Sequence, residues 1–235
     1  MKTSVFKDHE SVSHSAAQEI VSLVKQNPRL VMCLSTGSTP KLMYSLLQKS
    51  ADSMPGLFKS VRVITIDEWA GIPENDPCSC DYYLQQHVIK PLDISDSHYL
   101  RFRCNAEQPS EECHRIQTEL ASLGSIDLCI LGLGLNGHIA MNEPGKALNP
   151  NAHLSELTEE IKQHPMLASK TTKPHHGYTL GISDILSSKR IIMLATGNSK
   201  AVQLKRLLTP KIETTFPASF LWLHNNATVF TDLNV

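Results

Sequence analysis

The feature that most constrains the fold is the segment IDLCIL at residues 126–131, which ends in Gly132-Leu133-Gly134. Its apolar residues are nearly consecutive, a pattern typical of a strand that is buried on both faces. Similar runs occupy residues 30–34, 61–66 and 190–195, with a shorter one at 227–230. Because such strands lie inside parallel sheets that helices cover on both sides, we expect an α/β fold.

Helical patterns separate these runs along the chain. An amphipathic helix is expected over 8–27, another opens at Pro40, and further helices are expected over 79–90, 109–123 and 199–208. Strands that alternate with helices pair in parallel through right-handed crossovers. We therefore predict one domain over residues 1–235, a doubly wound, mostly parallel Rossmann-like sheet with helices on both faces.

One long segment, residues 145–176, is polar and irregular and ends in the pair His175-His176. Long irregular connections in compact domains are typically functional loops, such as lids that close over a site. We therefore predict an active-site lid at 145–176.

The composition excludes several classes of function. The formal net charge is −1, which gives no field that favours nucleic acid or an anionic membrane. No apolar run approaches the roughly 20 residues of a membrane helix, and the N-terminus lacks the apolar core of a signal peptide, so we expect a cytoplasmic protein. The six cysteines and eleven histidines lack the spacing of redox or metal motifs, so no metal site is expected.

Two strand-to-helix turns have the composition of anion-binding loops. The first contains Thr36, Gly37, Ser38 and Thr39, and the second leads to Lys200 in the first turn of a helix. Free N–H groups and the helix dipole favour a phosphate there, although an ordinary N-cap and a solvated lysine are the alternatives. Neither loop matches a P-loop or GxGxxG, so no nucleotide cofactor is expected.

Titratable side chains follow two of the predicted strands. Asp67 and Glu68 stand at the end of the run 61–66, where a partly buried carboxylate serves as a general base or as a cap. His138 follows Gly132 and Gly134, and its imidazole is suited to moving protons near neutral pH. Glu143 can hold that ring and stabilise its charged form. Gly132 allows a sugar to approach the backbone closely.

In combination these residues resemble the glucosamine-6-phosphate deaminase/isomerase family, whose wider relatives include 6-phosphogluconolactonases. The resemblance covers nearly the whole chain and rests on four motifs in order, LSTGSTP (34–40), IDEW (66–69), GLGLNGHIAMNEP (132–144) and GNSKA (197–201). The segments 127–134 and 217–224 look most like the galactosamine-6-phosphate isomerase branch.

The resemblance implies a role for each motif. Residues 36–39 and Lys200 hold the 6-phosphate of the substrate, with Glu68 and Gly132 also at the substrate. Asp67 takes the proton from C2 and returns it at C1, and His138 assists ring opening with the support of Glu143. No metal or organic cofactor is implied.

Three positions depart from the family's pattern. Asn136 stands where the deaminases have an aspartate, and an amide orients an imidazole without adding negative charge. The lid arginine that helps to bind phosphate has no clear counterpart, and Lys170 is the nearest candidate. The residues used for allosteric activation in hexameric deaminases are not recognisable beyond Pro144.

The sequence thus predicts an enzyme that deaminates and isomerises an amino-sugar 6-phosphate, with galactosamine 6-phosphate favoured and glucosamine 6-phosphate possible. Its expected partner is this small phosphorylated sugar, with neither nucleic acid nor membrane involved, and its oligomeric state is left open. Two alternatives remain: a sugar-phosphate isomerase or lactonase of the same fold, and a non-catalytic sugar-phosphate sensor.

Overall fold

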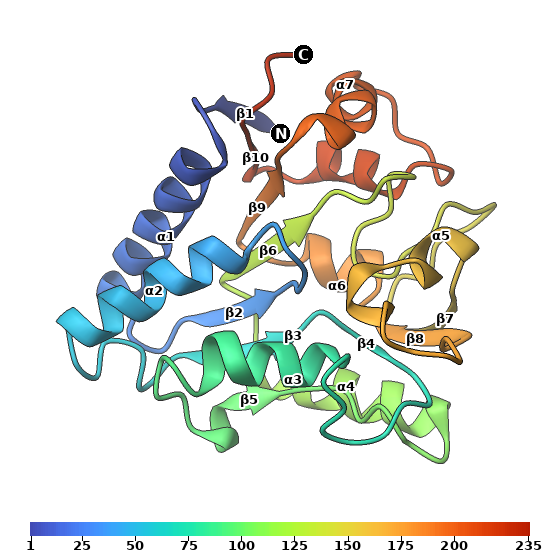
Figure 1. Cartoon of the computed structure of the whole chain (residues 1–235), viewed down its shortest axis with the longest axis horizontal. Helices are drawn as coiled ribbons and strands as arrows, with labels where there is room; N and C mark the ends of the chain where they lie inside the picture. Colours follow the sequence, from blue (N-terminus) through green and yellow to red (C-terminus); the bar gives the residue numbers. More distant parts are fainter.

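A seven-stranded parallel sheet forms the centre of the computed structural model, which describes residues 1–235 (Figure 1). The strand order is β1-β10-β9-β6-β2-β3-β5 and every neighbouring pair is parallel. This confirms the doubly wound sheet that the apolar runs predict. The strands are β1 (Lys2–Val5), β2 (Val31–Leu34), β3 (Arg62–Thr65), β5 (Tyr99–Leu100), β6 (Leu128–Gly132), β9 (Arg190–Ala195) and β10 (Ala227–Thr231).

Helices cover both faces of this sheet. Along β2, Met32 and Leu34 join one apolar core while Val31 and Cys33 join the other, as strand pleating requires. The first core is closed by α1 (His9–Gln26), α2 (Lys41–Ser53), α3 (Cys80–Leu84) and the π-helix Gln85–Ile89. The second is closed by α4 (Pro109–Leu123), α6 (Ile182–Leu186), α7 (Ala201–Leu208) and the 3-10 helix Pro217–Leu223.

One expected helix differs in detail, and one edge strand was not expected. The helix predicted over 79–90 is α-helical only as far as Leu84 and continues as a π-helix. The wider π turn keeps Val88 and Ile89 in the same core as Leu84. The edge strand β1 was not predicted, since its sequence KTSV is mostly exposed and carries no apolar run.

A second, three-stranded antiparallel sheet lies beside the first, in the order β4-β8-β7. It contains β4 (Asp67–Trp69), β7 (His153–Glu156) and β8 (His176–Thr179). The run 61–66 does end before Asp67, as expected, but the chain continues directly into another strand, β4. Ile66 joins the two sheets directly, because its N–H donates to the Leu34 carbonyl at 3.3 Å and its carbonyl accepts from the Leu180 N–H at 2.9 Å.

The segment 145–176 is more ordered than its composition indicates. It contains β7, α5 (Glu159–Lys162), the 3-10 helix Pro165–Leu167 and the first residue of β8. These elements are short and largely polar, so neither a helical nor a strand period is visible in the sequence. In Figure 1 they cover the side of the molecule beside β4.

The strand order reverses between β2 and β6. From β2 the chain proceeds outward to β3 and β5, and it then returns to β6 on the other side and continues to β9 and β10. Ligands of doubly wound sheets bind at the carboxyl ends of the strands at such a switch point. The segments that follow β2, β3, β6 and β9 leave the sheet at this edge. No helix of the chain has the length and apolar character needed to cross a membrane.

Candidate active site

The loop between β2 and α2 presents free backbone donors. Gly37 has φ +100°, a conformation that favours glycine. The hydroxyls of Tyr44 and Tyr83 donate to the carbonyls of Ser35 and Gly37, each at 2.6 Å. The backbone N–H groups of residues 36–39 have no acceptor in the chain, and α2 has no side-chain cap. The loop therefore has the properties of an anion site, as its sequence predicts.

The second loop brings a lysine to the same edge of the sheet. Lys200 ends the 3-10 helix Asn198–Lys200 and immediately precedes α7. Burial lowers the pKa of its ammonium group. Its charge also lowers the pKa of His138 and of His164, so these three basic groups converge. An anion is the missing partner for such a cluster.

Asp67 is buried but has few hydrogen-bond donors. It is 9% exposed, and the Cys80 thiol, 3.7 Å from Oδ1, is the one side chain that donates to it. Burial raises its pKa to about 7, against the smaller opposing effect of the thiol. The thiol also accepts from the Thr36 hydroxyl at 3.6 Å, which links the anion loop to this carboxylate. A carboxyl group that titrates near neutral pH is well matched to general base catalysis.

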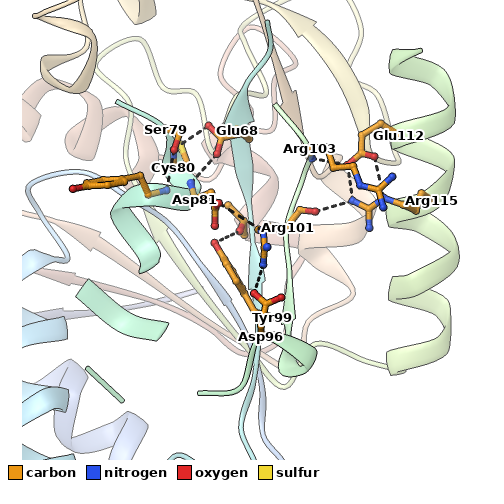
Figure 2. A network of polar contacts seen from close by, with 12 residues as sticks. Glu68, Ser79, Cys80, Asp81, Asp96, Tyr99, Arg101, Arg103, Glu112 and Arg115 are labelled. Atoms are coloured by element: carbon orange, nitrogen blue, oxygen red, sulfur yellow. Dashed lines mark hydrogen bonds and ion pairs between the residues drawn. The ribbon is translucent and has the colours of Figure 1, made fainter. Parts of the chain in front are cut away.

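Glu68 is held quite differently, although it is the next residue. Its carboxylate accepts from the backbone N–H groups of Trp69, Cys80 and Asp81 at 2.7–2.9 Å (Figure 2). Together with the Ser79 hydroxyl it caps the start of α3. Burial raises its pKa to about 8 and the three N–H donors oppose this. The structure therefore places Glu68 as a support for α3, with no donor-free oxygen directed at a substrate.

A relay of three side chains orients His138. Its Nδ1 lies 2.7 Å from Asn136 Oδ1, and Asn136 Nδ2 donates to Glu143 Oε2 at 2.9 Å. Since Nδ2 is the donor, Oδ1 is the acceptor, so the proton of the neutral ring is on Nδ1 and Nε2 carries the lone pair. The Thr158 hydroxyl also donates to Glu143 Oε2, at 2.9 Å.

The electrostatics of His138 differ from the sequence expectation. We expected Glu143 to stabilise the charged ring, and its Oε1 does lie 3.4 Å from Nδ1. Burial nevertheless lowers the pKa of His138 to about 4, with further contributions from Lys200 and His164. Burial raises the pKa of Glu143. The imidazole is therefore neutral at neutral pH.

Glycines allow this ring to lie against the backbone. A Cβ at Gly134 would be 2.4 Å from the His138 ring, and one at Gly137, where φ is +92°, would be 2.1 Å from the Phe216 ring. A Cβ at Gly132 would meet no atom within 4 Å. Gly134 and Gly137 are thus required by packing, whereas Gly132 faces open space at the end of β6.

The segment 145–176 supplies a histidine where a lysine was expected. Lys170 forms an ion pair with Asp76 and lines a cavity of about 490 Å³ beside Pro174 and His176. His164 is the residue that approaches the anion loop, since a Cβ on Gly37 would be 3.8 Å from its Nε2. Its isolated position in an irregular segment gave no sequence signal for this placement.

Comparisons with known proteins show the family to which the chain belongs. The family model described as glucosamine-6-phosphate isomerases/6-phosphogluconolactonase matches residues 7–230. An Escherichia coli (strain K12) protein with the name "Putative deaminase AgaI" is 37% identical over 220 residues, covering 94% of this chain and 87% of that protein. Glucosamine-6-phosphate deaminase 1 of Bacillus subtilis (strain 168) is 35% identical over 234 residues, covering 99% and 97%.

Solved structures show the same relationship. A monomeric glucosamine-6-phosphate deaminase is 34% identical and superposes with a TM-score of 0.92, over 98% of this chain and 97% of that one. A 6-phosphogluconolactonase from Trypanosoma cruzi shares the fold at 20% identity with a TM-score of 0.79. The two relatives that are named as deaminases are enzymes. The chain therefore belongs to the glucosamine-6-phosphate isomerase/deaminase family.

Proposed function

We propose that this protein converts an amino-sugar 6-phosphate and water into a ketose 6-phosphate and ammonia, without a cofactor. The observation that carries the proposal is Asp67, a buried carboxylate whose pKa is about 7 and to which one thiol donates. It lies next to a loop with four free N–H groups. A base of this pKa beside an anion site suits proton abstraction from a phosphorylated substrate at neutral pH.

In the proposed reaction Asp67 acts on the ring-opened sugar. It takes the proton from C2, the electron pair of that C–H bond forms a C1–C2 double bond, and the aldehyde oxygen at C1 takes a proton from water to become a hydroxyl group. Asp67 then returns the first proton to C1, and the nitrogen releases a proton to water, which leaves an imine at C2. Water adds to this imine, the C2–N bond breaks, and ammonia leaves with the ketose phosphate as the other product.

His138 serves the preceding ring-opening step. Its free Nε2 accepts the proton of the 1-hydroxyl group and delivers a proton to the ring oxygen. Asn136 fixes the tautomer that makes Nε2 an acceptor, and Glu143 holds Asn136. A neutral imidazole is the form that begins this transfer, which fits the low pKa of His138.

The phosphate binds to residues 36–39 and Lys200, and the segment 145–176 closes over it as a lid. Galactosamine 6-phosphate is the proposed substrate, with glucosamine 6-phosphate as the alternative epimer. The support for galactosamine is the resemblance of segments 127–134 and 217–224 to the galactosamine-6-phosphate isomerase branch.

Ammonia release tests the proposal directly. The purified protein is supplied with galactosamine 6-phosphate or glucosamine 6-phosphate, and hydrolysis of 6-phosphogluconolactone is measured in parallel. We expect ammonia from both amino sugars, with the higher kcat/KM for galactosamine 6-phosphate. Lactone hydrolysis without ammonia release would replace the proposal with a lactonase function, and binding without turnover would replace it with a sensor.

A further inference from the structure

A histidine of the segment 145–176 lies against the anion loop. His164 stands before the 3-10 helix Pro165–Leu167, and its Nδ1 accepts from the Met166 N–H at 3.3 Å. Because Nδ1 is an acceptor, the proton of the neutral ring is on Nε2. The chain provides no acceptor for that N–H, so Nε2–H is a free donor.

This donor is directed toward the loop. A Cβ built on Gly37 would be 3.8 Å from Nε2, an ordinary van der Waals separation. The imidazole is fixed from behind by Trp69, whose ring centroid is 5.9 Å away, and Trp69 is itself 3% exposed. The donor is therefore preorganised by the backbone of its own 3-10 helix and by a buried side chain of β4.

The surroundings of Nε2 match an anion with several oxygens. The N–H groups of residues 36–39 have no acceptor in the chain, and burial together with the Lys200 charge lowers the pKa of His164. Free donors and a lysine that forms no ion pair are stabilised when a phosphate occupies the space between them. A further donor from His164 would complete the enclosure.

We propose that His164 donates its Nε2–H to the substrate phosphate and is the residue through which the segment 145–176 grips it. The inference rests on the proposed function for the identity of the ligand. It assigns to His164 the role for which Lys170 was the sequence candidate, and the ion pair of Lys170 with Asp76 leaves that lysine to hold the segment elsewhere.

Two substitutions separate the role of each ring nitrogen. In His164→Asn the amide oxygen replaces Nδ1 and keeps the bond from the Met166 N–H, but the donor at Nε2 is lost. In His164→Gln the amide nitrogen reaches the position of Nε2, but the acceptor at Nδ1 is lost. Affinity for galactitol 6-phosphate and for galactitol is measured by calorimetry in both variants, in Lys200→Ala and in the unmodified protein.

We expect His164→Asn to bind galactitol 6-phosphate about 10-fold or more weakly, as for loss of a hydrogen bond to a charged group. His164→Gln should remain within about 3-fold of the unmodified protein, and the small affinity for galactitol should be equal in all variants. The inference is overturned if Asn and Gln bind the phosphate equally well, or if Asn weakens galactitol by the same factor.

The inference and the proposed function fail in different ways. If His164→Asn and Lys200→Ala both weaken galactitol 6-phosphate but the unmodified protein releases no ammonia, the phosphate contact stands and the deaminase proposal falls. If ammonia is released and only Lys200→Ala weakens the phosphorylated ligand, the deaminase proposal stands and His164 has no part in binding.

Discussion

The two carboxylates of strand β4 differ in the number of hydrogen-bond donors around them. On one side Glu68 is 1% exposed and accepts three backbone N–H groups. On the other side Asp67 is 9% exposed and accepts from one thiol. Burial raises the pKa of both carboxyl groups, to about 7 for Asp67 and to about 8 for Glu68, so the two differ in their hydrogen-bond partners. The oxygens of Glu68 are occupied by backbone N–H groups, whereas those of Asp67 are left open to a substrate. The contrast supports the proposal that Asp67 is the base and that Glu68 holds the start of α3.

The test with the largest expected effect is Asp67→Asn, which removes the proposed base and preserves the shape of the side chain. We expect kcat to fall on the order of 10²–10⁴-fold with little change in KM. Asp52→Asn, on the exposed end of α2, is the matched control and should leave both constants unchanged. Turnover within a few-fold of the unmodified protein would show that Asp67 is not the base.

The same variant should gain stability in a pH-dependent way. Because burial raises the pKa of Asp67 from 3.8 to about 7 on folding, folding favours its neutral form, and stability from this group is lost as the pH rises between these two values. Asp67→Asn should therefore raise Tm at pH 8 by at least about 3 °C, and by less at pH 5. An equal Tm difference at both pH values would contradict this assignment.

The second test alters Glu68, the carboxylate that accepts three backbone N–H groups. In Glu68→Gln one oxygen is replaced by an amide that cannot accept, so at least one N–H at the start of α3 loses its partner. A loss of about 1–3 kcal/mol is expected, or roughly 2–4 °C in Tm for each kcal/mol. Glu119→Gln, an exposed carboxylate paired with Arg115, is the control. A Tm equal to that of the control would show that the cap contributes little.

The third test creates a pair of neighbouring carboxylates. In Asn136→Asp an oxygen would replace the amide that donates to Glu143 Oε2 at 2.9 Å, so the two acids must share a proton. His138 keeps its acceptor, and kcat should stay within about 10-fold. The raised pKa of the pair makes stability fall as the pH rises, so Tm should drop more between pH 6 and pH 8 than in the unmodified protein. An equal drop in Tm between pH 6 and pH 8 in both proteins would show that the two acids do not share a proton.

The smallest expected effect comes from the single thiol that donates to Asp67. The acidic limb of kcat/KM should report the Asp67 pKa, with activity lost as the pH falls through about 7. Cys80→Ser offers a stronger donor and should move this limb to lower pH, whereas Cys80→Ala removes the donor and should move it to higher pH, each by a few tenths of a unit. Shifts in the same direction for both variants would mean that packing rather than hydrogen bonding is responsible.

Much of the fold is visible in the sequence because the strands of the central sheet are locally encoded. The runs at 30–34, 126–131 and 190–195 coincide with β2, β6 and β9 to within two residues. The anion loop is also local, since strand, glycine and helix start are contiguous. These features depend on neighbours in the chain, which pattern reasoning detects well.

The remainder of the site depends on distant contacts. The donors to Glu68 from Cys80 and Asp81 are 12 and 13 residues away, and Thr158 is 15 residues from Glu143. The sequence offers base and cap as alternatives for Asp67 and Glu68, but nothing near them indicates that Glu68 is the one that caps α3, and nothing near His164 indicates that its ring approaches Gly37. The sequence therefore predicts the chemical groups of the site, but it does not show which of these groups already form hydrogen bonds within the protein.

The Thr158 hydroxyl has one further consequence. It accepts from the Ile161 N–H as the cap of α5 and donates to Glu143 Oε2. The order of α5 and the ionisation of Glu143 are therefore thermodynamically linked, and the coupling free energy is the same in both directions. A neutral carboxyl group accepts more weakly than a carboxylate, so protonation of Glu143 loosens α5, and loss of the α5 cap favours that protonation. Through the carboxylate of Glu143, the segment 145–176 and the side chains that orient His138 affect each other.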